Sequence, residues 1–317
     1  MPWTYILIFI VSCFILVRSG MWVVKALIRI AQFLKLREFI VASFLMAFAT
    51  SLPELFVGIT SAVAGKPELP FGVIIGSNIV ALTVMVALGA LLGKNLHVKG
   101  KVLQKSALYA ALSSLLPLLL ILDGVFSRKD GMILLAALVF YFVQLIAEEG
   151  KFRKVFNNQL KGWHHFKIFV KDMFVFLIGA AMLLLSAEGI VFSASKLAET
   201  FNLSLMVIGV SLVALGTSLP EIAFEIRAIG IGHKTMILGN IMGSVVINAT
   251  LVLGLVGLIS PFAITDFSPY LIGAVSTLAA CWFFIKFIRS ERKVTEMEAL
   301  FLIGIYILFI VAELYFV

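Results

Sequence analysis

Charged residues are scarce in this sequence: Asp, Glu, Lys and Arg together make up 13% of its 317 residues. Soluble domains carry about 25% charged residues, whereas 62% of this chain is apolar. Cysteine is scarce too, and because Cys13 and Cys281 both lie inside apolar runs, a disulfide framework and a zinc site are excluded. We expect no enzyme either, since no Ser-His-Asp set, histidine cluster or phosphate-binding loop lies in the apolar segments.

Apolar runs long enough to cross a bilayer follow one another along the whole chain. A helix that spans the hydrocarbon core needs about 20 residues. We therefore predict an all-α membrane protein of ten transmembrane helices, at residues 3–28, 38–63, 69–93, 104–122, 131–148, 172–198, 204–230, 236–259, 270–288 and 298–316.

The basic residues divide unevenly between the two sides of the predicted bundle. Of the 25 Lys and Arg residues, 19 lie in connections on one side, 4 on the other and 2 within the first run. By the positive-inside rule, the richer side is cytoplasmic and both termini are extracytoplasmic. The formal charge of +8 is then a topology signal, and we expect no nucleic-acid partner. The predicted location is a plasma or inner membrane, with the lipid bilayer as partner and no obligate protein partner evident.

The chain contains an internal repeat. A shift of 167 residues superposes residues 47–54 (AFATSLPE) on 214–221 (ALGTSLPE), and the same shift carries residues 72–77 (GVIIGS) onto 239–244 (GNIMGS). In the predicted topology the two copies cross the membrane in opposite directions, as in transporters built from inverted repeats.

This repeat divides the chain into three parts. We predict a first five-helix repeat at residues 1–148, a basic cytoplasmic linker at 149–171 and a second five-helix repeat at 172–317. The linker is expected to lie at the headgroup surface, and its basic composition leaves a regulatory or lipid-binding role open.

Each copy places a proline and several polar residues in the middle of a span. Pro53 and Pro220 are expected to break their helices and to free carbonyl groups about one turn earlier, near Ala49 and Gly216. In each copy an alanine, two hydroxyl residues and a glutamate follow the spacing i, i+3, i+4, i+7 and share one helix face. These residues are Ala47, Thr50, Ser51 and Glu54 in the first copy and Ala214, Thr217, Ser218 and Glu221 in the second.

The two glutamates point to cation transport. A carboxylate in the bilayer core is costly, and neither Glu54 nor Glu221 has a Lys or Arg within a turn of its own helix. A mobile cation is the natural partner, because hard oxygen donors suit Ca²⁺ and Na⁺. Ser77, Ser244 and Asn248 are expected to add oxygen donors. The alternative is that both glutamates are protonated or bond neighbouring helices.

These segments resemble the signature repeats of the cation/calcium exchanger superfamily, in particular its sodium/calcium exchanger branch. The resemblance implies an antiporter in which Ca²⁺ and Na⁺ compete for overlapping sites at mid-membrane, opened alternately by sliding of the first and sixth helices. It implies as ligands the carbonyls of Ala47 and Ala214 and the side chains of Thr50, Ser51, Glu54, Ser77, Thr217, Ser218, Glu221 and Ser244.

Two positions depart from the family pattern. Ala81 stands where the family usually has Asn or Asp, and Asn248 stands where an acidic residue is common. Neither departure touches Glu54 or Glu221, so we expect divalent binding to survive. The departures leave the ion selectivity open.

Two other acidic residues lie within predicted spans. Glu225 follows Glu221 by one turn, where the first copy has Gly58, and either extends the ion pathway toward the cytoplasm or pairs with Arg227. Glu188 lies in the sixth helix and is either a gating or proton site or a helix contact.

We therefore predict a secondary antiporter that exchanges Ca²⁺ for Na⁺ by alternating access, without a resident cofactor. One alternative is an exchanger of the same fold for Mg²⁺, or one coupled to H⁺ or K⁺. Another class, a cation channel or a non-exchanging cation-binding membrane protein, differs from an exchanger in needing no counter-ion gradient.

Overall fold

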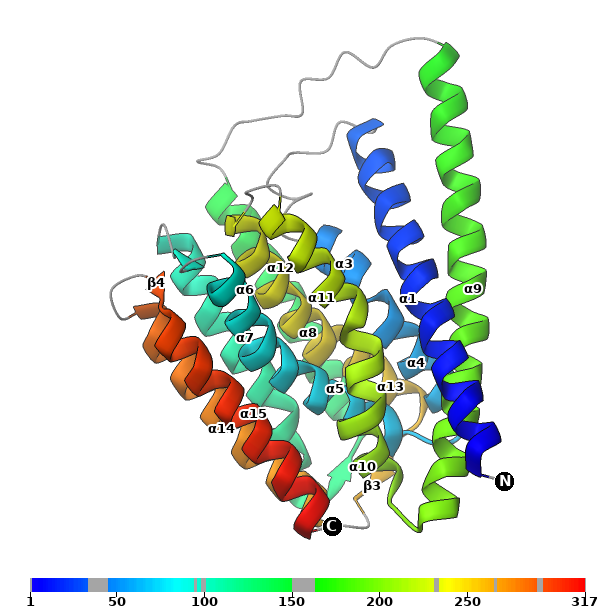
Figure 1. The fold of residues 1–317 in the computed structure, drawn as a ribbon, viewed down its shortest axis with the longest axis vertical. Helices are drawn as coiled ribbons and strands as arrows, with labels where there is room; N and C mark the ends of the chain where they lie inside the picture. Colours follow the sequence, from blue (N-terminus) through cyan, green and yellow to red (C-terminus); the bar gives the residue numbers. More distant parts are fainter. Residues whose placement is uncertain are drawn as a thin grey trace.

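A computed structural model describes residues 2–33, 45–93, 96–97, 101–149, 163–230, 234–264, 267–289 and 293–316. Over these residues the chain forms a bundle of helical segments, several of which join two or three shorter elements (Figure 1). The beginning of α1 and the end of α15 lie at the same end of the bundle (Figure 1), as an even number of crossings requires.

The elements follow the predicted order of spans. In the first half they are α1 (Pro2–Phe33), α3 (Met46–Thr50), α4 (Leu52–Val63), α5 (Glu68–Val80), a π-helical segment (Ala81–Met85), α6 (Val86–Leu92), α7 (Lys101–Leu120), a 3₁₀ turn (Ile121–Asp123) and α8 (Arg128–Glu149). In the second half they are α9 (Trp163–Phe201), α10 (Leu205–Ile208), a π-helical segment (Gly209–Val213), α11 (Ala214–Gly230), α12 (Lys234–Ile247), a π-helical segment (Asn248–Val252), α13 (Leu253–Ile259), α14 (Phe267–Arg289) and α15 (Glu296–Phe316).

Eight of the described helical segments are long and apolar enough to cross a membrane. The second and fifth predicted spans are not among these eight. The shorter apolar helix α4 lies at the second predicted span, and the 22-residue helix α8 lies at the fifth. The predicted all-α membrane fold is confirmed.

Two very short antiparallel sheets, which the sequence did not predict, tie the halves together. β1 (Leu96–His97) pairs with β4 (Lys293–Val294), and β2 (Val125–Phe126) pairs with β3 (Phe262–Ala263). Leu96 and Ala263 are 167 residues apart, and so are Phe126 and Lys293. β3 and β4 lie at opposite ends of the bundle (Figure 1). The same cross-connection is therefore formed twice, once at each end, as inverted repeats require.

The two motif prolines, Pro53 and Pro220, differ in their effect on the helices. The interruption at Ser51 separates α3 from α4, as the adjacent Pro53 predicts. Pro220, in contrast, lies inside the continuous helix α11. A proline removes only one helical hydrogen bond, and here the backbone irregularity falls about two to three turns earlier, in the π-helical segment Gly209–Val213.

The predicted linker at 149–171 overlaps the start of helix α9. Helix α9 already begins at Trp163, so residues 163–171 are helical, because the apolar pattern of this span continues into its N-terminal turns. Residues 150–162 lie outside the described part of the chain.

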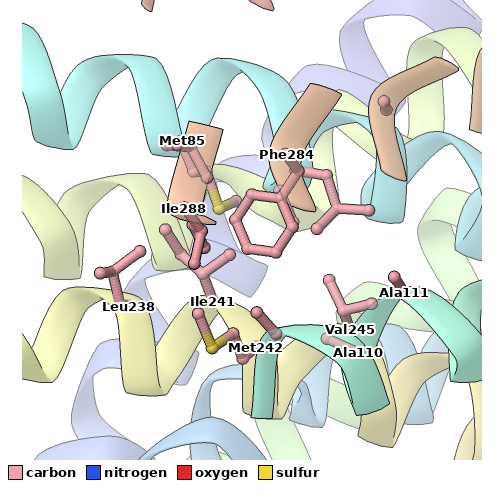
Figure 2. Close-up of a cluster of buried hydrophobic side chains, with 14 of the residues drawn as sticks. Met85, Ala110, Ala111, Leu238, Ile241, Met242, Val245, Phe284 and Ile288 are labelled. Atoms are coloured by element: carbon pink, nitrogen blue, oxygen red, sulfur yellow. The ribbon is translucent and has the colours of Figure 1, made fainter. Parts of the chain in front are cut away.

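The apolar core keeps most helices together as one block. Met85, Met242 and Phe284 come from the first-half π-helical segment, α12 and α14, and they meet in one buried cluster (Figure 2). Helices α1 and α9 instead pack along each other on one flank of the bundle (Figure 1). Arg29 and Asp172 join these two helices by a salt bridge of 2.7 Å.

Candidate cation-binding site

Hydroxyl groups from both repeats meet in the centre of the bundle. Thr50 Oγ1 on α3 lies 3.2 Å from Ser244 Oγ on α12, and Ser77 Oγ on α5 lies 3.5 Å from Thr217 Oγ1 on α11. The shift of 167 residues converts Thr50 into Thr217 and Ser77 into Ser244, so these are two copies of one contact. Ser218 Oγ also donates to Ser77 Oγ at 3.3 Å. Four helices therefore bring their polar faces together across the two repeats.

All the predicted ligands are buried inside the bundle. Their exposed fractions run from 0% to 3%, which means that these polar faces turn toward protein and not toward lipid. The set comprises Ala47, Thr50, Ser51, Glu54, Ser77, Ala214, Thr217, Ser218, Glu221, Ser244 and Asn248.

Several oxygen atoms of this set have no hydrogen-bond partner. They include both carboxylate oxygens of Glu54 and of Glu221, together with Ser51 Oγ and Asn248 Oδ1. Glu54 and Glu221 each follow by one turn the threonine that contacts a serine of the other repeat. Neither glutamate takes part in a salt bridge among the described residues. Buried anions without donors or counter-charges are costly, so this arrangement is suited to a bound cation.

The two alanine carbonyls are already engaged. The carbonyl oxygen of Ala47 accepts the backbone N–H of Ser51 at 3.0 Å and the hydroxyl of Thr50 at 3.2 Å. The carbonyl oxygen of Ala214 accepts the hydroxyl of Thr217 at 3.3 Å. A carbonyl oxygen has two lone pairs, so an ion at Ala47 must replace one of these donors.

Asn240 is a polar member of this cluster that the sequence analysis missed as a site residue. It is fully buried on α12, and its Oδ1 lies 3.2 Å from Thr50 Oγ1. Its equivalent in the first repeat is Val73, and this mismatch concealed it because the search relied on residues shared by both copies. Asn78, whose equivalent is Val245, is likewise buried with an unpartnered Oδ1.

Two glycines allow the helices of this site to touch. A Cβ atom added at Gly72 would overlap the carbonyl oxygen of Met206, and one added at Gly76 would overlap that of Val210. Helix α5 therefore lies directly against the backbone that leads into α11. This close approach brings Ser77 within reach of Thr217 and Ser218.

The two accessory acids differ in position. Glu225 is fully buried on α11, both of its carboxylate oxygens lack a hydrogen-bond partner, and its charge acts on Glu221. The side chain of Arg227, its alternative partner, lies outside the described residues. Glu188 is exposed on α9 and does not join the buried carboxylates.

Comparison with protein families gives a match over almost the whole chain. The sequence model of the family described as Sodium/calcium exchanger protein matches residues 4–147 and 171–315. These two stretches fall on the two halves of the bundle.

Individual proteins show the same similarity at lower identity. The sodium/calcium exchanger MaX1 of Methanosarcina acetivorans is 25% identical over 350 residues, which cover 98% of this chain and 98% of that protein. The inner membrane protein YrbG of Escherichia coli (strain K12) is 27% identical over 256 residues, 77% of this chain and 78% of that protein. The putative antiporter CaxA of Alkalimonas amylolytica is 29% identical over 237 residues, 73% of each chain.

Solved structures extend the similarity to the fold. A structure of the sodium-calcium exchanger NCX_Mj, soaked with Na⁺ and Sr²⁺, superposes with a TM-score of 0.68 at 26% identity. The superposition covers 97% of this chain and 98% of that one.

Proposed function

The chain belongs to the sodium/calcium exchanger family and is thus a multi-pass membrane antiporter of cations and not an enzyme; we propose that it exchanges Ca²⁺ for Na⁺. In this proposal the ions bind in the middle of the membrane, between the two inverted repeats. The chain lies in a plasma or inner membrane with both termini on the extracytoplasmic side.

One observation carries the proposal. Glu54 and Glu221 are buried beside hydroxyls that meet across the two repeats, and neither has a counter-charge among the described residues. A single Ca²⁺ between them neutralises both carboxylates, and Na⁺ ions can replace it because both cations prefer hard oxygen ligands.

The hydroxyl and amide groups supply the remaining ligands. Calcium takes about 6–8 oxygen ligands at 2.3–2.6 Å, and two carboxylates alone fall short of this number. The unpartnered oxygens of Ser51 and Asn248 are free to contribute. Thr50, Ser77, Thr217, Ser218 and Ser244 hold hydroxyls in the same cluster. The amide of Asn248 and the methyl group of Ala81 leave the selectivity among Ca²⁺, Mg²⁺ and monovalent cations to be measured.

Helices α1 and α9 are suited to expose this site alternately to the two sides. They pack mainly on each other, whereas the polar cluster lies on helices of the main block. A Cβ atom added at Gly20 of α1 would lie 3.5 Å from Pro53 and 3.7 Å from Pro220. Helix α1 thus passes over both motif prolines, and its sliding would open one side of the site while it closes the other.

Substitution of the glutamates tests this proposal. Glu54→Gln and Glu221→Gln keep the side-chain shape but remove the charge, so each is expected to abolish Na⁺-driven ⁴⁵Ca²⁺ uptake into proteoliposomes. Glu296→Gln is the control, because it makes the same change at an exposed position at the start of α15. Its uptake should equal that of the wild type.

Two results would contradict the proposal. Near-normal uptake in both site variants, with the same amount of folded protein, would remove Glu54 and Glu221 from the site. Uptake of ⁴⁵Ca²⁺ that persists without any counter-ion inside the vesicles would identify a channel instead of an exchanger.

A further inference from the structure

A third buried carboxylate, that of Glu225, lies outside the hydroxyl cluster just described. It is 0% exposed, and neither of its oxygens has a hydrogen-bond partner. It forms no salt bridge among the described residues. Like Glu54 and Glu221, it is therefore a buried acid whose negative charge no cationic side chain among the described residues neutralises.

The fold does not require an acid at this position. The equivalent residue of the first repeat is Gly58, and a Cβ atom there would lie 2.7 Å from Val252 Cγ1 and 3.6 Å from Val256 Cγ2. In the first repeat, then, hydrocarbon fills the space beside this helix. In the second repeat the neighbouring residues Ile222 and Phe224 pack against an apolar cluster, part of which is drawn in Figure 2. Packing alone does not explain a carboxylate at Glu225.

Glu225 lies next to the proposed Ca²⁺ site but is not part of the same ligand group. It follows Glu221 by four residues on α11, about 6 Å along the helix axis and on the same face. Yet among the described residues no three acidic, histidine or cysteine side chains are close enough to hold one metal ion together. Glu225 thus offers a second ion position beside the main site, and Glu221 would be a ligand of both positions.

The position lies toward the predicted cytoplasmic side. From Glu221 the helix continues through Glu225 to Gly230, and α12 begins at Lys234 after a short connection. This connection belongs to the side that is rich in basic residues. An ion at Glu225 would therefore lie between the main site and the cytoplasm.

The charges indicate which kind of ion fits. With Ca²⁺ between Glu54 and Glu221, two of the three carboxylates are neutralised and one negative charge remains in a low-dielectric interior. We propose that Glu225, together with Glu221, forms a second cation position that takes a single monovalent cation, Na⁺, on the cytoplasmic side of the Ca²⁺ site. This inference rests on the proposed function of the main site.

Equilibrium binding of ²²Na⁺ to the purified full-length protein in detergent tests the second position. The wild type at saturating Ca²⁺ is expected to retain a ²²Na⁺ ion that excess unlabelled Na⁺ displaces. Glu225→Gln is expected to lose this ion while its ⁴⁵Ca²⁺ binding persists. Glu225→Gly, which copies the residue of the first repeat, gives a second variant should the glutamine fold poorly. Glu296→Gln, at an exposed position at the start of α15, is the control and should bind as the wild type does.

The outcomes separate this inference from the proposed function. Equal ²²Na⁺ binding by the wild type and both Glu225 variants would overturn the second position. Failure of the wild type to bind ⁴⁵Ca²⁺ would instead refute Ca²⁺ as the ion of the main site. In that case the ²²Na⁺ difference between wild type and variants, measured without Ca²⁺, still decides the role of Glu225.

Discussion

Replacement of Gly76 by alanine should damage both ion binding and stability. The added Cβ would lie 2.6 Å from the Cβ of Ala214, whereas ordinary contacts begin at 3.4 Å, so α5 and the start of α11 must separate by at least 0.8 Å. The Ser77–Thr217 contact, at 3.5 Å, is already at the limit of a hydrogen bond. Metal–ligand distances tolerate about 0.2 Å, so this displacement is large for a coordination shell that spans both repeats.

The substitution has two opposing effects on the free energy of unfolding. Overpacking costs about 1–3 kcal/mol, while alanine is favoured over glycine in a helix by roughly 1 kcal/mol. We therefore expect Gly76→Ala to lower the free energy of unfolding by at most about 2 kcal/mol. Its Ca²⁺ affinity should fall on the order of tenfold, which corresponds to about 1.4 kcal/mol.

A matched glycine provides the control. A Cβ atom at Gly304 on α15 meets nothing within 4 Å, so Gly304→Ala should keep wild-type affinity and unfold at the same or a slightly higher temperature. Both variants can be compared by ⁴⁵Ca²⁺ binding and thermal unfolding in detergent. Wild-type Ca²⁺ affinity in Gly76→Ala would refute the idea that close contact of α5 and α11 positions the ligands.

Three further predictions concern other parts of the molecule. Arg29→Met leaves Asp172 without its partner; the Arg29 side chain is 50% exposed and that of Asp172 is 3% exposed. We expect a loss of about 1–3 kcal/mol in unfolding free energy, most of which the additional change Asp172→Leu restores. An unchanged stability would show that the pair is not formed. Asn240→Leu removes the amide beside Thr50 and should weaken Ca²⁺ binding in calorimetry with little change in melting temperature, whereas full affinity would exclude the amide from the site. In a cysteine-free background, an impermeant maleimide should label a cysteine at Arg128 on intact cells and one at Arg289 only after permeabilisation, and the reverse pattern would invert the proposed topology.

Much of the arrangement follows from the duplicated sequence. Because both copies carry the same hydroxyl and glutamate spacing, Thr50 and Thr217 were expected on equivalent faces of oppositely directed helices. The structure adds what spacing cannot give, namely that each threonine contacts the serine of the other repeat. A helix periodicity describes one helix face, whereas contacts between helices depend on packing from all sides.

Features outside strict symmetry could not be predicted in this way. Asn240 and Asn78 each occur in only one copy, so a search for shared residues passes over them. The three π-helical segments, among them Asn248–Val252, carry no signal in hydropathy because a single wide turn leaves the apolar pattern intact. The sequence likewise does not reveal that α11 continues through Pro220 after such a segment.

Uptake of ⁴⁵Ca²⁺ into proteoliposomes that differ only in their internal counter-ion tests the central claim most directly. Vesicles are loaded with Na⁺, with K⁺ or with a proton gradient, and Mg²⁺ and Mn²⁺ are added outside as competitors. The account predicts rapid uptake with internal Na⁺ alone and weak inhibition by Mg²⁺. Absence of Na⁺-driven uptake, or uptake driven equally well by K⁺ or protons, would contradict Ca²⁺/Na⁺ exchange by this protein.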